Sequence, residues 1–147
     1  MKRVKFLLSA LLAFAGVAAM AQSEEELAKL ADPAYAKWGD TPLERYNNVN
    51  RSSFLKEALQ NKNYNEAASH YLYLVEHAPT AAESIYQRGE QVYLRKWAQQ
   101  KTVATQRQMF DSVLMVYDHR LQYFGTTPEA KAEILDRRAR QYAKYGK

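Results

Sequence analysis

The sequence of 147 residues contains no cysteine, and it holds only five glycines and four prolines. The lack of cysteine excludes a disulfide framework, thiolate metal ligands, a cysteine nucleophile and a lipid-modified cysteine anchor. So few glycines and prolines disfavour a turn-rich β-fold and favour helices. Hydrophobic residues make up 47% of the chain, which is enough for the core of one domain.

The first 21 residues have the three parts of a secretory signal. Three cations in residues 2–5 precede an apolar run, residues 6–18, and residues 19–21 place alanine at both positions read by a signal peptidase. The alternative is a membrane anchor, but a spanning helix needs about 20 apolar residues and this run is shorter. The pattern predicts cleavage after Ala21 and an exported protein, periplasmic or extracellular, that begins at Gln22 and has no transmembrane helix.

Removal of this segment changes the charge balance. It holds three of the 21 Lys and Arg residues and none of the 16 Asp and Glu residues, which leaves 18 basic against 16 acidic residues. Such a small excess gives little support for a nucleic-acid partner. The last segment is locally basic and is expected to be a solvated helix end, with an anionic glycan or membrane surface as the alternative; its cations are Arg137, Arg138, Arg140, Lys144 and Lys147.

Residues 22–50 are expected to form an N-terminal arm. Ser23 and Glu26 have the spacing of a capping box, which predicts a short helix through Ala31. Asp32-Pro33 and Thr41-Pro42 then interrupt the helical pattern.

From Arg51 onward, apolar residues recur with helical spacing almost without pause. We therefore expect an all-α domain over residues 51–147. Gly125 is expected to end a long helix, and Thr127-Pro128 to open the last one with threonine as its cap. The apolar stripes lie within residues 54–59, 67–75, 85–97 and 110–124, and the last helix has Ala132, Leu135, Ala139 and Tyr142 as its apolar side.

The spacing of small and aromatic residues indicates repeated helical hairpins. Ala67, Tyr71 and Pro79 match the second half of the tetratricopeptide pattern. There, a small residue allows close helix approach, an aromatic ring fills the gap, and proline ends the helix. Gly89 lies 34 residues after Leu55, at the glycine position of a second, longer repeat. We predict a tetratricopeptide-like hairpin array of about five helices, an α–α superhelix; the alternative is a generic helical bundle.

The chain also resembles the exported tetratricopeptide-repeat proteins of Bacteroidota over about residues 36–125. The resemblance implies a helical scaffold for protein interactions, and it supplies no catalytic or cofactor-binding residue. Family members typically continue with further helical repeats. The motifs that carry the resemblance are Trp38-Gly39-x-Thr41-Pro42-x-Glu44, Lys62-Asn63-Tyr64-x-Glu66-Ala67, Ala78-Pro79, Ile85-Tyr86-x-x-Gly89 and Asp111-Ser112-x-Leu114-Met115-x-Tyr117-Asp118-x-Arg120-x-x-Tyr123-Phe124-Gly125.

When the sequence is aligned with the tetratricopeptide pattern in this way, one face of the array is expected to form a peptide groove of mixed polarity. Its predicted lining is Ser52 and Lys56 from the first repeat, with Tyr86, Glu90 and Tyr93 from the second. The partner is expected to be a protein or peptide, and self-association is left open.

Other polar patterns give weaker indications of chemistry. His70 and His77 are seven residues apart, too far along one helix for a shared metal, and neither they nor His119 belong to an HExxH motif. Ser53 and Lys56 have the serine–lysine spacing of penicillin-binding enzymes, but the companion motifs are absent.

Asp111 and Asp118 lie on the long predicted helix with Arg120 nearby, and we expect them to form its solvated or ion-paired edge rather than a carboxylate pair for acid–base chemistry. We expect neither metal nor cofactor. The favoured function is an exported, non-enzymatic interaction module. The alternatives are an envelope or carbohydrate-associated accessory protein that uses the tyrosines and the basic end, and a hydrolase that uses Asp118 and a histidine.

Overall fold

The computed structural model describes residues 23–146, and every regular element within that range is a helix. The predicted all-α class is therefore confirmed, whereas the predicted signal segment and its cleavage after Ala21 lie outside the described residues. A helix over residues 23–30 comes first. The 3₁₀-helix η1 (Pro33–Trp38) follows, and then come α2 (Pro42–Gln60), α3 (Tyr64–His77), α4 (Ser84–Ala98), α5 (Val103–Phe124) and α6 (Pro128–Tyr145).

The chain divides between Tyr46 and Asn47, inside α2, into two compact units. In the first, Arg45 donates from Nη1 to the carbonyl of Leu30 at 2.9 Å and from Nε to the carbonyl of Gly39 at 2.8 Å. Its guanidinium thereby satisfies a carbonyl at the end of the first helix, which the helix itself leaves unpaired.

Helix α2 begins at Pro42, nine residues before the expected start at Arg51. The Thr41 hydroxyl accepts from the Glu44 amide at 3.2 Å, and the Glu44 carboxylate accepts from the Thr41 amide at 3.1 Å. These reciprocal bonds form a capping box. They also lower the pKa of Glu44, because backbone amides stabilise its charged form. Thr41-Pro42 thus opens a helix rather than interrupting one.

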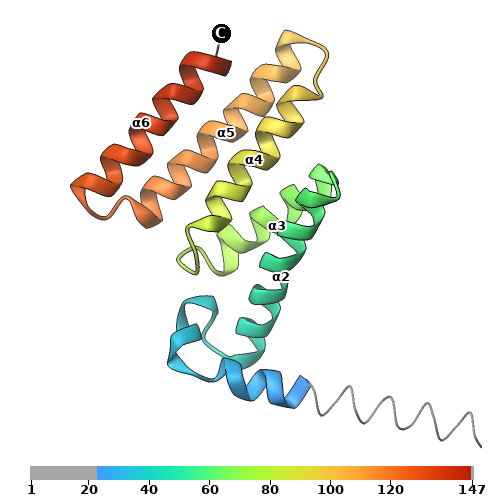
Figure 1. The fold of residues 1–147 in the computed structure, drawn as a ribbon, viewed down its shortest axis with the longest axis vertical. Helices are drawn as coiled ribbons and strands as arrows, with labels where there is room; N and C mark the ends of the chain where they lie inside the picture. The colour runs from blue at the N-terminus through green and yellow to red at the C-terminus, as the bar shows by residue number, and fades with distance from the viewer. Residues whose placement is uncertain (1–22, 147) are drawn as a thin grey trace, which may run out of the picture. The chain divides into compact units, whose positions relative to one another are not determined.

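In the second unit, consecutive helices pack antiparallel, as Figure 1 shows for α4, α5 and α6. Its core is made mainly of aliphatic and tyrosine side chains. The largest fully buried members are Tyr71, Tyr86, Tyr117, Leu55, Leu74, Ile85, Ile134, Val92, Val113 and Val116. The small residues that were expected at helix contacts, Ala67 and Gly89, are both buried.

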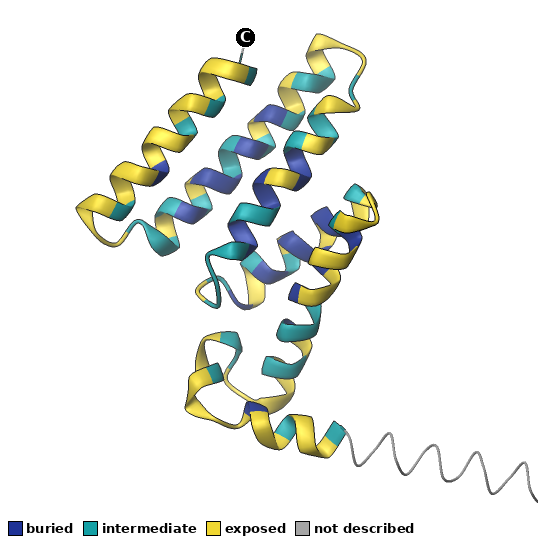
Figure 2. Ribbon diagram, in the orientation of Figure 1, coloured by how far each residue is buried: buried dark blue, intermediate teal, exposed yellow. Residues whose placement is uncertain are grey.

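Helix α6 begins as the sequence predicts. The Thr127 hydroxyl accepts from the amide of Ala130, and Gly146 follows the last turn. Its orientation differs from the expectation, however. Ile134 is its one buried residue, whereas Leu135, Ala139 and Tyr142 of the predicted core-facing side are exposed. Figure 2 shows this largely exposed helix beside the more deeply buried α5.

Candidate interaction surfaces

The residues predicted to line a peptide groove do not form one. Tyr86 is 0% exposed, Glu90 3% and Tyr93 6%, and Ser52 is also buried; Lys56 alone of the five is exposed. The prediction of an open face here is wrong because α4 is covered on several sides. The rings of Tyr86 and Tyr93 meet Tyr71 of α3 edge-on, with centroids 6.2 and 6.1 Å away.

Helix α5 covers α4 from another side. The Tyr86 ring lies 5.5 Å from that of Phe124, and its hydroxyl donates to the carbonyl of Pro79 at 2.7 Å. Burial raises the pKa of Tyr86 well above its ordinary value, because the charged phenolate would be poorly solvated there. Tyr86 is therefore a core residue that fixes the contact between the two hairpins.

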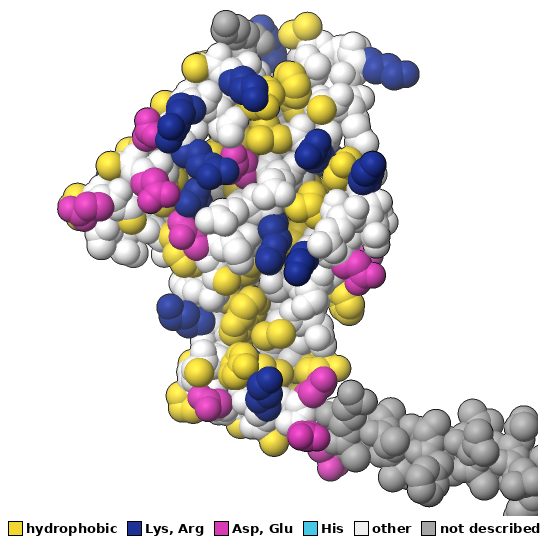
Figure 3. All heavy atoms as spheres, in the orientation of Figure 1, with side chains coloured by type: hydrophobic (Ala, Val, Ile, Leu, Met, Phe, Trp, Pro, Cys, Tyr) yellow, Lys and Arg dark blue, Asp and Glu magenta, His cyan; other side chains and the backbone are white. Residues whose placement is uncertain are grey.

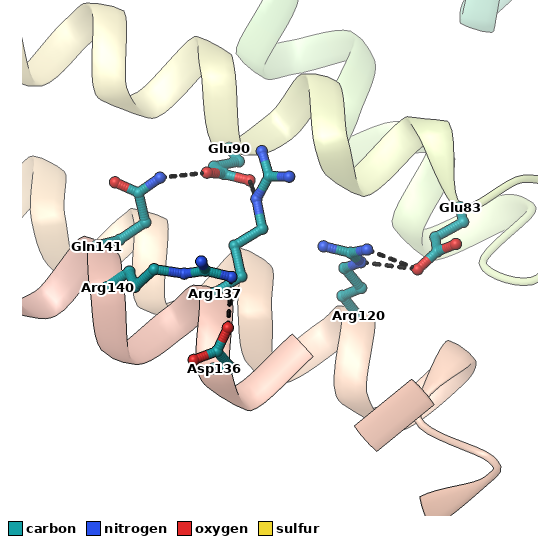
Figure 4. Close-up of polar contacts among 7 residues, drawn as sticks. All are labelled: Glu83, Glu90, Arg120, Asp136, Arg137, Arg140 and Gln141. Carbon is teal, nitrogen blue, oxygen red and sulfur yellow. Dashed lines mark hydrogen bonds and ion pairs between the residues drawn. The ribbon is translucent and has the colours of Figure 1, made fainter. Parts of the chain in front are cut away.

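Glu90 points from α4 towards α6, as Figure 4 shows. Its carboxylate accepts from Arg137 Nε at 3.2 Å and from Gln141 Nε2 at 2.8 Å. Burial, together with the nearby Glu90 charge, raises the pKa of Tyr117 to about 12. Because a buried carboxylate is costly unless it is paired, these two contacts make Glu90 an anchor for α6.

A second, partly buried ion pair joins α5 to the segment before α4 (Figure 4). Arg120, 4% exposed, donates from Nε and Nη2 to Oε1 of Glu83, at 2.9 and 2.8 Å. Asp118, two residues before Arg120 and on a nearly opposite side of α5, pairs with Arg138 of α6 at 3.2 Å. Asp118 is therefore ion-paired and Asp111 is exposed, as expected for a solvated or ion-paired helix edge, whereas Arg120 pairs on another side of α5.

The three histidines lie in different surroundings. His70 accepts from Arg51, His77 stacks on Tyr73 with centroids 4.0 Å apart, and His119 lies 3.3 Å from the hydroxyl of Tyr71. Within residues 23–146, no group of three His, Asp or Glu side chains is arranged to hold a metal ion.

Two of the surface hollows lie between helix pairs of the second unit. The first, which we call the α5/α6 groove, has a volume of about 510 Å³. It lies along the apolar side of α6, where Leu135 is 39% and Tyr142 57% exposed. Its lining residues are Leu114, Leu135, Arg138, Ala139, Tyr142 and Ala143.

The second hollow, which we call the α2/α3 pocket, has a volume of about 600 Å³. Its polar character comes from amide, guanidinium, imidazole and carboxylate groups, and Phe54 and Tyr73 add aromatic rings. Its lining residues are Asn47, Asn50, Arg51, Phe54, Glu66, His70 and Tyr73. The sequence pattern does not indicate this pocket, because it places Phe54 in the apolar stripe of residues 54–59, whereas Phe54 is 48% exposed. The spacing of Asn47, Asn50 and Phe54 places them on one helical face, and this pattern could have indicated the pocket.

Charged and apolar side chains alternate over the visible surface of α4, α5 and α6 (Figure 3). None of the helices in the described range is both long and apolar enough to cross a membrane. No family profile, no curated protein and no solved structure matches the chain.

Proposed function

We propose that this chain is an exported, non-enzymatic scaffold of the tetratricopeptide type, and that it binds a partner protein through the α5/α6 groove. The observation that carries the proposal is the orientation of α6. Its apolar side, Leu135, Ala139 and Tyr142, is exposed, although the Tyr142 ring also meets Phe110 of α5.

The inner side of α6 combines one aliphatic contact with polar and aromatic ones. Ile134 is buried, Arg137 and Gln141 bond to Glu90, and Tyr145 meets Trp97 with ring centroids 4.9 Å apart. These residues recur at helical spacing and hold α6 in place. Of the outer apolar side, Tyr142 meets the Phe110 ring of α5 with centroids 5.9 Å apart. Leu135 and Ala139 stay exposed, and a partner that covers them accounts for this exposure.

The occupant that fits is an amphipathic helix of the partner protein. Leu135, Ala139 and Tyr142 form a stripe at steps of four and three residues, the pattern of a helix-packing surface. Alanine at 139 and 143 leaves room for close approach, as Ala67 and Gly89 do inside the unit. The Asp118–Arg138 pair at the edge supplies a polar rim.

Several observations support the repeat type. Ala67, Tyr71 and Gly89 lie buried at helix contacts, Pro79 follows the end of α3, and consecutive helices are antiparallel. The export proposal is based on the N-terminal pattern of charge and hydrophobicity.

Site-specific photo-crosslinking in envelope extracts tests the proposed partner site. The photoreactive residue p-benzoylphenylalanine is placed at Ala139 in the groove or, as the matched control, at Glu133, which is exposed on the same helix. We expect an adduct from position 139 with a helical segment of one protein, and none from position 133. Leu135→Glu should abolish the adduct without loss of helical circular dichroism.

Three results would contradict the proposal. They are equal labelling from both positions, labelling that Leu135→Glu leaves unchanged, and labelling only of further copies of this chain. The last result would mean that the groove joins copies of this chain and does not bind a different protein.

A further inference from the structure

The α2/α3 pocket lies on a different hairpin from the α5/α6 groove, and the proposed function does not use it. We infer that this pocket binds the carboxylate of a small ligand or peptide, with Arg51 as the charged contact and Phe54 as the apolar wall. A volume of about 600 Å³ lies within the range of small-molecule sites.

The charge of Arg51 favours an anionic ligand. Among the described residues, no carboxylate forms an ion pair with Arg51, whereas Arg120, Arg137, Arg138 and Arg140 each have one. Arg51 is half-buried and lines the pocket. A guanidinium that is partly removed from water and lacks an acidic partner favours an anionic ligand.

Two contacts within the pocket fix the orientation of Arg51. Its Cζ lies 4.6 Å from the centre of the Tyr73 ring, and its Nη1 donates to His70 Nδ1 at 3.1 Å. The two contacts use one face and one nitrogen of the guanidinium. They leave its other donors free for a carboxylate, and they hold the side chain in place before the ligand arrives.

Other polar side chains of the pocket supply further hydrogen-bond donors. Asn47 and Asn50 lie on the Arg51 face of α2 and provide amide donors. His70 is 7% exposed, and its Nδ1 accepts from Arg51, which leaves Nε2 as the protonated ring nitrogen. That nitrogen lies 3.6 Å from Glu66 Oε1, beyond hydrogen-bond distance.

Phe54 and Glu66 determine which anion fits. Phe54 is 48% exposed and lies 5.8 Å from the His70 ring, so it offers a flat apolar surface to the rest of the ligand. Glu66 lines the pocket from α3 with a negative charge. A doubly charged phosphate would meet stronger repulsion from Glu66 than a singly charged carboxylate, so the pocket favours the carboxylate.

Titrations monitored by NMR test this inference on the full mature chain. The probes are benzoate, which has both ring and carboxylate, benzyl alcohol, which has the ring alone, and acetate, which has the carboxylate alone. Changes in the chemical shifts of the Arg51 side chain and the His70 ring report where the probe binds. We expect benzoate to bind in the millimolar range and at least about tenfold more tightly than benzyl alcohol.

The variants have effects of opposite sign. Arg51→Gln should weaken benzoate binding about tenfold or more, because it removes the charge-assisted hydrogen bonds. Glu66→Gln should tighten binding about two- to threefold, because it removes a repelling charge. Arg107→Gln is the matched control, since Arg107 is exposed on α5, and it should leave binding unchanged. If Arg51→Gln does not fold, Arg51→Lys keeps the charge and should weaken binding by a smaller factor.

The inference is overturned if benzoate and benzyl alcohol bind equally, or if none of the probes shifts the Arg51 or His70 resonances. It is also overturned if phenyl phosphate binds more tightly than benzoate, because the pocket would then select a phosphate. None of these results bears on the α5/α6 groove, whose crosslinking is measured separately.

Discussion

The ring of Tyr71 in α3 lies directly against the backbone of Gly89 in α4. A Cβ atom added to Gly89 would come within 2.5 Å of Tyr71 Cε2 and 2.6 Å of Cδ2. Tyr71 is 0% exposed, and it also meets the rings of Tyr86 and Tyr93. The Tyr71 ring is enclosed by these contacts. The close approach of α3 and α4 therefore depends on the absence of a side chain at Gly89.

Gly89→Ala is therefore expected to lower the free energy of unfolding by about 2 kcal/mol, as overpacking of a core does. In an ordinary helix interior the same change would raise stability by about 1 kcal/mol, because alanine is the better helix former. Urea unfolding followed by circular dichroism measures the difference. Gln91→Ala on the exposed side of α4 is the control, with an effect below about 0.5 kcal/mol. A more stable Gly89→Ala protein would show that Tyr71 and Gly89 are not in contact.

Glu90→Gln should lower stability by about 2 kcal/mol, since it leaves Arg137 without its buried charged partner. The loss should be concentrated in α6, because Arg137 and Gln141 both belong to that helix. Hydrogen exchange of the α6 amides is the measurement, and faster exchange there than in α3 is expected. Asp136→Asn breaks the exposed pair with Arg140 and should cost less than about 0.5 kcal/mol. Similar losses for both variants would argue against a buried Glu90.

The neighbours Ile134 and Leu135 provide a test of the orientation of α6. Ile134 is 1% exposed and Leu135 39%. Ile134→Ala should cost about 2–4 kcal/mol through the cavity that it leaves, and Leu135→Ala less than about 1 kcal/mol. Thermal unfolding of the two single variants measures this. The reverse order would mean that α6 is rotated by about one residue from the observed position.

Alkaline pH should destabilise the fold through its buried tyrosines. Burial raises the pKa of Tyr71, Tyr86 and Tyr93, and raises that of Tyr117 to about 12. The folded state therefore favours the neutral phenol. This contribution to stability is complete below the unfolded pKa of about 10 and decreases, by about 1.4 kcal/mol per pH unit for each such phenol, as pH rises towards the folded pKa.

Absorbance at 295 nm measures this titration. In the folded protein, part of the signal from the eleven tyrosines should develop only at about pH 12 and above, whereas guanidinium-unfolded protein should titrate in a single step near pH 10. Tyr117→Phe should reduce the late phase. Superimposable curves for folded and unfolded protein would contradict the burial of these phenols.

Local sequence signals located most helix ends. Thr127 predicted the start of α6, because its hydroxyl satisfies an amide within the next turn. The same chemistry occurs at Thr41 and Glu44, but Thr41-Pro42 resembles an interruption because proline breaks helices, so the predicted start of α2 is nine residues too late. Both signals are local, so both were available in the sequence.

The faces of the helices were harder to predict. The apolar stripe of α6 suggested that Leu135 and Tyr142 lie in the core, but Ile134 does. On α4, the side that a hairpin array would leave open holds Tyr86, Glu90 and Tyr93, and other helices cover it. The sequence pattern therefore indicated neither the α5/α6 groove nor the α2/α3 pocket.

The sequence by itself determined that this chain is helical, where its turns fall, and which small residues allow close contact, because capping, proline and side-chain period act within a few residues. Only the tertiary structure decided that Glu90 is buried, since the arginine that neutralises it lies 47 residues further along the chain. It also decided that Arg51 has no acidic partner among residues 23–146 and that Leu135 and Ala139 of α6 are exposed. Each of these outcomes depends on which helix lies beside which, and that arrangement comes from the packing of the whole unit.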